Sequence, residues 1–437
     1  MDADHLTSTE STHARGEKGV VGLDAQSEAS GAVANDVSHE PLAASWRAEP
    51  LSPAETSKVV QILEACRDHD LPALAALATS DGGLVEDEMR RIAWPLLLGC
   101  GDGGVSTSQP SWQTLPAHRD EHQVELDVNR SFIYYPKGES ETQIDSRKQQ
   151  LSNVITEVLR RHPLLCYFQG YHDIVQVLLL VLGAEKAVDA VAHLSLLRIR
   201  DFMLPSLSAA ISHLQLLPAI MYAADAELCE HLSQTMKQPF FALAATLTMY
   251  AHDIQEYGDI ARLFDFLLAR EAVFSVYLFA VVITSRKNDL LSIPPTEPET
   301  LHSILSTLPR PLALDPLLAR TTSLFAQHPP ASLPFRAWSR ISRHSVLKTT
   351  RDARLSLLDG EALFRRQAAE MERVEAWERR RGWVRAFARR YRREVVGVGG
   401  AVLVALVAVW LGSGGVERVV GEGVAGLVRW VGGAVGE

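Results

Sequence analysis

The chain has 437 residues, of which 47% are hydrophobic and 22% are charged, the proportions of a globular protein with a packed core. Its formal net charge of −10 gives no overall electrostatic reason to bind nucleic acid. The four cysteines are widely spaced and form no CxxC pair. A disulfide framework and a thiolate zinc site are therefore not expected, and a reducing compartment fits best.

The first 47 residues are rich in Ser, Ala, Glu, Asp and His. They lack the basic start and the apolar core of a signal peptide. Such a composition cannot bury enough apolar surface to fold, so we expect residues 1–47 to form a disordered tail.

Helical signals fill most of residues 48–345. A capping box, Ser52-Pro53-Ala54-Glu55, predicts the first helix start, and a second helix is expected over residues 84–98 with Gly99 as its stop. Further stretches with a helical pattern are residues 151–162, 174–182, 187–198, 206–222, 226–235, 240–250, 259–268 and 273–284. No run alternates apolar and polar residues long enough to predict a sheet, so the expected fold class is all-α.

The sequence contains no visible nucleotide or metal site. No GxxxxGK[ST] loop is present, so the chain is not expected to hold a phosphate group of its own. His118 and His122 are four residues apart, as metal ligands on a helix would be, but Arg119 stands where a zinc protease has Glu. No third ligand suggests itself. We therefore expect two surface histidines and no metal.

The segment from Val124 to Arg130 carries one acid–base pair. On a helix Asp127 and Arg130 are neighbours three positions apart, so the carboxylate can hold the guanidinium in one orientation. Taken alone, the pair would be an ordinary surface ion pair of small energy.

A second polar segment, Tyr167-Phe168-Gln169-Gly170-Tyr171-His172-Asp173, lies between Pro163 and the apolar run 174–182. Gln169 is expected on a turn just before a buried helix, which is a rigid mount for an exposed amide. Taken alone, it would be an ordinary polar loop residue.

Together these segments resemble the TBC domain, the GTPase-activating domain for Rab proteins. Three signatures of that family occur in order: an RxxxWP-type start at Arg90 to Pro95, an IxxDxxR element at Val124 to Arg130, and a YxQG element at Tyr167 to Gly170. Residues 240–244 and 262–268 are also similar to that domain, and the resemblance covers roughly residues 80–340. The form YFQGYHD, followed by a C-terminal span, is most similar to the endoplasmic-reticulum-anchored branch, of the TBC member-twenty and yeast Gyp-eight type.

Three positions depart from the family pattern. Val124 stands where isoleucine is usual, Ser131 where threonine is usual, and His172-Asp173 replaces the commoner continuation. None of the three removes the chemistry that the family uses, but the last leaves open which Rab the domain fits.

The resemblance implies a fold of two helical lobes and a mechanism. Arg130 would be an arginine finger oriented by Asp127, and Gln169 would place the attacking water, with Tyr167 and Gly170 in support. The chain would have no cofactor of its own, because GTP and Mg²⁺ are carried by the partner, a Rab-family GTPase of the type acting between endoplasmic reticulum and Golgi. The alternative is a non-catalytic membrane scaffold or tether that binds a Rab through the same surface.

A membrane anchor is expected near the C-terminus. No charge occurs in residues 395–416, which as a helix would span about 33 Å, enough to cross a hydrocarbon core of about 30 Å. Eight arginines lie between residues 379 and 393, whereas only Arg418 and Arg429 follow the span, so the basic side is expected to stay cytosolic. Residues 346–394 then form a charged, helical juxtamembrane segment, and residues 417–437 a short lumenal tail.

These features together predict a tail-anchored protein of the endoplasmic reticulum membrane with a cytosolic catalytic domain. A mitochondrial outer-membrane anchor could have a similar sequence, and so, less readily, could a buried core helix.

Overall fold

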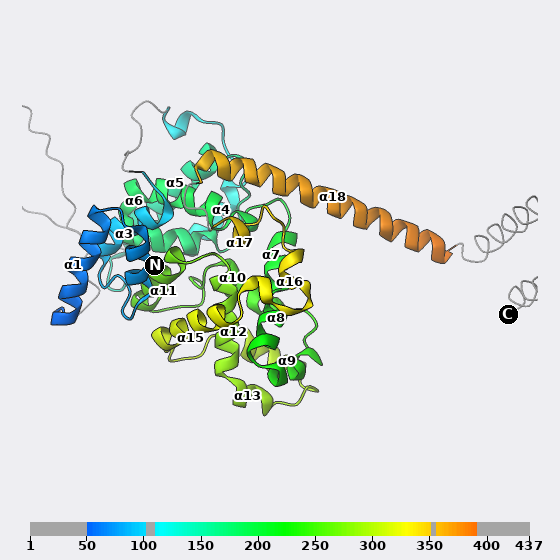
Figure 1. Cartoon of the computed structure of the whole chain (residues 1–437). Helices are drawn as coiled ribbons and strands as arrows, with labels where there is room; N and C mark the ends of the chain where they lie inside the picture. The colour runs from blue at the N-terminus through cyan, green and yellow to red at the C-terminus, as the bar shows by residue number, and fades with distance from the viewer. Residues whose placement is uncertain (1–49, 102–109, 351–354, 391–437) are drawn as a thin grey trace, which may run out of the picture. The chain divides into compact units, whose positions relative to one another are not determined.

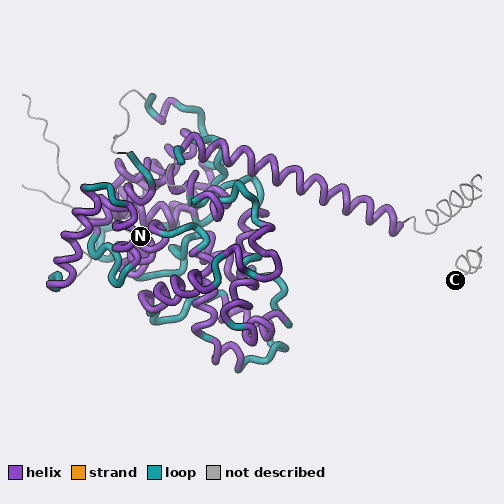
Figure 2. The backbone as a smooth tube through the Cα atoms, in the orientation of Figure 1, coloured by secondary structure: helices purple, strands orange, loops and turns teal. Residues whose placement is uncertain are grey.

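The computed structural model describes residues 50–101, 110–350 and 355–390 (Figure 1). These residues form helices joined by loops, and none of them lies in a strand (Figure 2). The expected all-α class is therefore confirmed for this part of the chain. The predicted tail 1–47, span 395–416 and tail 417–437 all lie outside the described residues.

One group of helices packs around a long central helix, α6. The members of the group are α1 (Pro53–Arg67), α2 (Leu71–Thr79), α3 (Asp87–Leu98), α4 (Glu121–Val128), α5 (Glu141–Arg161), α6 (Tyr171–Leu197) and α11 (Tyr257–Ala269). Helices α3, α4 and α5 lie against α6, whereas α11 lies against α2 and α3. Helix α6 is apolar on nearly all sides because it is surrounded, and its N-terminus positions the YxQG turn.

A second group packs around α12. Its helices are α7 (Ser208–Leu214), α8 (Leu217–Ala224), α9 (Ala226–Ser233), α10 (Leu243–Leu247), α12 (Phe274–Ser285), α13 (Lys287–Leu291), α14 (Pro298–Leu305), α15 (Leu314–Gln327), α16 (Ala337–Arg340) and α17 (Val346–Thr349). Short 3₁₀ turns are η1 (Trp112–Thr114), η2 (Arg200–Phe202), η3 (Phe240–Ala242), η4 (Pro330–Ser332) and η5 (Pro334–Arg336). Helices α8 and α15 flank α12. One continuous set of buried apolar side chains runs through both groups, and the expected division into two lobes stays a prediction.

Several helix ends follow the sequence signals. The Ser52 amide donates to the Glu55 carboxylate at 2.9 Å, and the Glu55 amide donates to the Ser52 hydroxyl, so the predicted capping box is formed. Gly99 ends α3 with φ of 81°, the left-handed conformation that glycine adopts without strain.

Other boundaries differ from the prediction for local reasons. The helix expected over residues 206–222 is two helices, because Pro218 at the start of α8 has no amide hydrogen with which to continue α7. The two helices expected over residues 174–182 and 187–198 are confirmed as the two halves of α6, which meet at a kink where Gly183 has a non-helical φ of 74°. The helix expected from residue 84 begins only at Asp87, because Val85 has a positive φ of 68°.

A buried polar cluster ties α3 to α11. Arg90 is 1% exposed and Asp265 is 0% exposed, and their side chains pair through Nη2 and Oδ2 at 3.0 Å. The Asp265 carboxylate also accepts from Trp94 Nε1 at 2.8 Å and from the Leu84 amide at 2.9 Å. The RxxxWP start and the 262–268 stretch, far apart in sequence, therefore meet at one carboxylate.

The last described helix, α18 (Leu357–Arg390), begins as part of the packed body. Phe364 and Gln367 are buried, and Gly360 lies so close to α6 that an added Cβ would be 2.9 Å from Leu196 Cβ. Further along, Trp377 and Trp383 are exposed. Among the helices that the structure describes, none combines the length and the apolar character needed to cross a membrane.

Candidate functional site

An open groove of about 640 Å³ joins three segments that are distant in sequence. It is lined by residues 130–135, by the turn before α6 with the first residues of α6, and by η3, α10 and the residues after α10. Arg130, Gln169 and Gly170 all line this groove. Asp127 and Tyr167 do not line the groove. Asp127 pairs with Arg130, and Tyr167 donates a hydrogen bond to Asp127.

Arg130 and Asp127 form the predicted ion pair, with unequal exposure. The Asp127 side chain is 0% exposed, whereas that of Arg130 is 61% exposed. Asp127 lies in the last turn of α4, and Arg130 follows in a turn closed by a bond from its amide to the Asp127 carbonyl at 3.0 Å. A buried carboxylate therefore holds one side of a guanidinium whose remaining donors face the groove.

Two further donors fix the Asp127 carboxylate. Gln123 Nε2 donates at 3.1 Å, and the Tyr167 hydroxyl donates at 3.0 Å. Burial raises the pKa of Tyr167, and the neighbouring Asp127 raises it further, so the phenol keeps its proton at neutral pH. The Tyr167 oxygen in turn lies 3.1 Å from His172 Nδ1. Because the phenol proton points to Asp127, the proton of that second bond must come from His172 Nδ1.

Gln169 lies at the turn that precedes α6, as predicted, and its side chain is exposed in the groove. Gly170 caps α6 with φ of 99°, and a Cβ there would be 2.6 Å from Thr248 Cγ2. Only glycine fits this turn without movement of α10 or its neighbours. The following residue, Tyr171, is fully buried and bonds Ser195 at 2.7 Å, so the turn is fixed from within α6.

Gln176 is a site residue that sequence reasoning missed. Its Oε1 accepts from the Phe132 amide at 2.9 Å, and its Nε2 donates to the Tyr135 carbonyl at 3.5 Å. These bonds hold the 131–135 loop on α6, and leave Ile133 and Tyr134 with exposed fractions of 73% and 42%. The signal available in the sequence was a single amide in an otherwise apolar run.

A row of titratable side chains continues the groove beyond His172. His172 Nε2 is 3.3 Å from Asp173 Oδ1, and His252 Nδ1 is 3.0 Å from Asp173 Oδ2. Burial lowers the pKa of His172, whereas the hydrogen bond to Asp173 raises the pKa of His252. His252 comes from the loop between α10 and α11, so nothing in its own sequence neighbourhood predicted this contact.

The two histidines considered as metal ligands are not a pair on one helix. His118 precedes α4 and is 8% exposed, so its expected surface position was wrong. Its Nδ1 accepts from the Asp120 amide at 3.2 Å, which turns the ring inward, whereas His122 on α4 is exposed. Within the described ranges, one group could hold a metal ion: Cys100, Asp189 and His193, whose donor atoms lie within 4.8 Å of one another. None of the three lines the groove.

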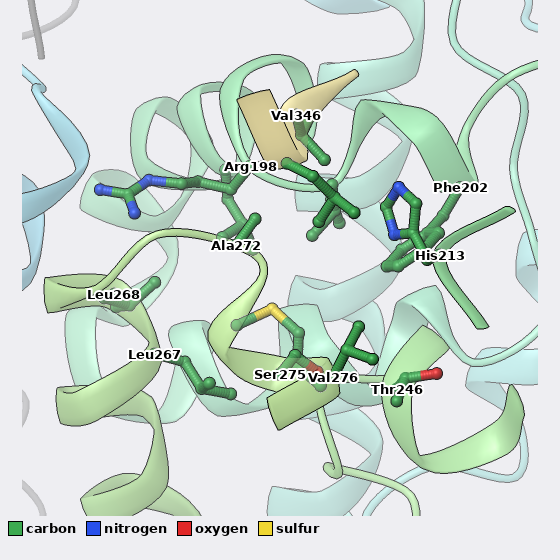
Figure 3. A pocket seen from close by; sticks show the side chains of 14 residues that line it. Arg198, Phe202, His213, Thr246, Leu267, Leu268, Ala272, Ser275, Val276 and Val346 are labelled. Atoms are coloured by element: carbon green, nitrogen blue, oxygen red, sulfur yellow. The ribbon is translucent and has the colours of Figure 1, made fainter. Parts of the chain in front are cut away.

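A second, buried cavity of about 40 Å³ lies between the two helix groups. Figure 3 shows its mainly apolar lining, with Leu267, Leu268 and Val276 on one side and Val346 and Phe202 on the other. The cavity has room for little more than one or two waters. It shares no lining residue with the groove and offers no place for a nucleotide or a protein partner.

Known proteins that are similar to this chain come from one family. Residues 87–291 match the Rab-GTPase-TBC domain. The chain is 35% identical over 282 residues to TBC1 domain family member 20 of Bos taurus, covering 63% of this chain and 68% of the relative. It is 32% identical over 318 residues to GTPase-activating protein gyp10 of Schizosaccharomyces pombe, covering 71% of this chain and 84% of the relative.

Two further matches have lower sequence identity. GTPase-activating protein GYP8 of Saccharomyces cerevisiae is 27% identical over 226 residues, covering 46% of this chain and 44% of the relative. The crystal structure of the Ypt/Rab-GAP domain of Gyp1p shares the fold with a TM-score of 0.50 at 14% identity, covering 62% of this chain and 98% of that one. The chain belongs to the Rab-GTPase-TBC domain family, and is similar to its TBC member-twenty and Gyp8 representatives.

Proposed function

We propose that this protein stimulates GTP hydrolysis by a Rab-family small GTPase, which supplies the GTP and the Mg²⁺. The observation that carries the proposal is the pairing of an exposed guanidinium, Arg130, with an exposed amide, Gln169, along one groove. The names of the relatives, which include GTPase-activating proteins, support the same reaction.

Arg130 acts as an arginine finger. The transition state of GTP hydrolysis spreads charge over the transferred phosphoryl group, and a cation inserted from outside stabilises it. Such a residue accelerates hydrolysis by about 10³–10⁵-fold, or about 4–7 kcal/mol of barrier. Because Asp127 binds only part of the guanidinium, the remaining donors can bind phosphate oxygens without breaking the ion pair.

Gln169 positions the attacking water in trans, a task that many GTPases assign to a glutamine of their own. Its Oε1 can accept a hydrogen bond from the water while its Nε2 donates one to a phosphate oxygen. The Gly170 turn supports this function because it fixes the direction of the amide relative to α6. Tyr167 supports Arg130 because it fixes the Asp127 carboxylate.

The apolar rim of the groove is suited to a protein partner. Ile133, Tyr134 and Phe240 are exposed, with fractions of 73%, 42% and 50%, and all three line the groove. Exposed aromatic and aliphatic side chains beside a charged centre are typical of protein–protein contacts. We place the Rab switch regions against this rim, with the nucleotide facing Arg130 and Gln169.

Residues 395–416 form the membrane anchor in this proposal, and the domain faces the cytosol at the endoplasmic reticulum. The support is the length of the uncharged run and the arginines before it. Deletion of residues 379–437 is expected to leave activation of a soluble Rab intact and to release the protein from membranes. Loss of activity of the soluble fragment would contradict the assignment of residues 379–437 to membrane binding alone.

A single-turnover GTPase assay tests the catalytic proposal. The full chain is added in excess to each member of a panel of GTP-loaded Rabs, and the hydrolysis rate is compared with the intrinsic rate. At least one Rab, of the type that acts between endoplasmic reticulum and Golgi, is expected to respond by 10³-fold or more. A Rab that binds the chain without acceleration would instead support the scaffold alternative.

A further inference from the structure

A second charged concavity lies at the base of α18, and nothing in the catalytic proposal uses it. It is lined by the side chains of Arg343, His344, Arg365, Arg366 and Arg373, together with Ala369. Arg343 and His344 precede α17, whereas Arg365 and Arg366 are adjacent on α18 and Arg373 lies about two turns further along that helix. Four arginines therefore converge on one hollow from two separate segments of the chain.

The positive charge of this hollow is only partly compensated. Arg365 pairs with Glu361 at 3.0 Å, but within the described ranges no carboxylate forms an ion pair with Arg343, Arg366 or Arg373. Arg373 Nε donates to the Ala369 carbonyl at 3.0 Å, and Arg343 Nε donates to His344 Nε2 at 3.2 Å. A second acid, Glu370, acts on His344 and accepts from the Ser342 hydroxyl at 2.6 Å. Most guanidinium donors of the hollow are thus available to an anion.

The positive charge of the hollow also acts on the pKa of His344. Burial lowers its pKa, and the charges of Arg343, Arg366 and Arg200 lower it further, although Glu370 opposes them. A neutral imidazole next to several guanidinium groups accepts a hydrogen bond from one of them, as His344 does from Arg343. The other guanidinium forks have the planar geometry that suits phosphate oxygens.

We propose that this hollow, which we call the α18 basic pocket, binds the phosphorylated headgroup of an anionic membrane lipid. The arginines come from two segments, the α16–α17 connection and α18, and one phosphate group is too small to bind all of them. The headgroup class is therefore a multiply phosphorylated inositol. This assignment does not depend on activity towards a Rab.

The continuation of α18 favours a lipid over a soluble phosphate. Arg366, Arg373 and Arg380 are seven residues apart, so they lie along one side of the helix. Trp377 is 57% exposed between them and stacks under Arg381 at 5.0 Å, and Trp383 is 68% exposed one and a half turns further. Basic side chains interspersed with exposed tryptophan are typical of a helix at the headgroup level of a membrane. The pocket lies at the end of this stripe that joins the folded body.

Titration calorimetry of the full chain in neutral detergent micelles tests the proposal. The micelles are doped with phosphatidylinositol bisphosphate or, at matched charge, with phosphatidylserine, and a third titration uses soluble inositol trisphosphate. We expect saturable binding of the bisphosphate lipid and of the soluble headgroup, and much weaker binding of phosphatidylserine. The double substitution Arg366→Gln, Arg373→Gln should weaken both phosphoinositide titrations by about tenfold or more.

Arg320→Gln is the matched control, because Arg320 is also exposed on a helix but lies on α15. It should bind as the wild type does. Equal affinity for the two lipids at matched charge, or undiminished binding by the double variant, would overturn the pocket. Binding of inositol trisphosphate without binding of the lipid would overturn its assignment to a membrane.

Discussion

Two Asp–Arg pairs in this protein have the same chemistry and opposite uses. In the pair of Arg90 with Asp265 both side chains are buried, with exposed fractions of 1% and 0%. In the pair of Arg130 with Asp127 the carboxylate is equally buried, but the guanidinium is 61% exposed. The first pair binds α3 to α11, and the second presents a cation at the surface.

The difference lies in how the donors of each arginine are used. Arg90 bonds Asp265 through Nε and Nη2 and Asp87 through Nη1, so all three of its nitrogens are engaged. Arg130 bonds Asp127 through Nη2 alone. A buried carboxylate that is fixed by other donors can therefore link two helices or orient an exposed arginine. Which of the two it does depends on how many guanidinium nitrogens remain without a protein partner.

The largest effect is expected for Arg130→Ala. Hydrolysis by the partner should fall by about 10³–10⁵-fold, because the transition-state cation is lost. The free energy of unfolding should fall by about 1–3 kcal/mol, because the buried Asp127 carboxylate loses its counter-ion but keeps the Gln123 and Tyr167 donors, and the variant should still fold. Single-turnover assays and thermal unfolding of the same preparation measure both, with Arg320→Ala as control. Arg130→Lys should also be largely inactive, because an ammonium cannot form the bidentate fork.

The next effect is expected for Arg90→Met. This change leaves the buried Asp265 carboxylate without its counter-ion, which should cost about 3–5 kcal/mol in unfolding free energy. Urea denaturation at neutral pH measures the loss, and Arg320→Met, at an exposed position, should unfold as the wild type does. The activity of the molecules that remain folded should be close to normal. A stable Arg90→Met protein without activity would reverse the assigned uses of the two pairs.

A smaller effect is expected for Tyr167→Phe. The change removes the phenol donor of Asp127, so the carboxylate and Arg130 become less well fixed. We expect a rate loss of about tenfold and a stability loss of about 1 kcal/mol. Tyr222→Phe is the control, because Tyr222 is 40% exposed and lies outside the groove. If Tyr167→Phe kept the full rate, the phenol would have no part in orienting Arg130.

The smallest effect concerns pH. Burial lowers the pKa of His172 in the folded state, so this imidazole binds a proton more readily in the unfolded chain. The free energy of unfolding should therefore fall as pH drops below about 6.5. The pKa of His252 is raised, so its contribution is complete below about pH 6.5 and is lost as pH rises through the folded-state value. Unfolding free energies measured from about pH 5 to 8 should therefore lose their acid decline in His172→Asn and their alkaline decline in His252→Asn. Unchanged profiles would contradict both contacts.

What the sequence predicted was local. The Asp127–Arg130 pair is three residues apart and the Gln169–Gly170 turn is contiguous, so helical spacing and turn chemistry were sufficient to place them. The roles of these residues came from the resemblance to a family, because the individual residues resemble ordinary surface positions.

What the sequence did not predict depends on contacts between distant segments. Arg90 and Asp265 are separated by 175 positions, and no periodicity relates them. Gln176 and His252 reach the site only because the packing of α6 against its neighbours brings them there. The burial of His118 and the convergence of Arg343 with Arg366 have the same origin, since each depends on a neighbouring element that the local sequence does not specify.

The central claim, that Arg130 stabilises the transition state of a partner's reaction, is tested most directly with a transition-state analogue. The cognate Rab, loaded with GDP and aluminium fluoride, is mixed with the full chain, and complex formation is followed by size-exclusion chromatography. A stable complex is expected with the wild type and none with folded Arg130→Ala at the same concentration. An equally stable complex with Arg130→Ala would contradict the role of this side chain.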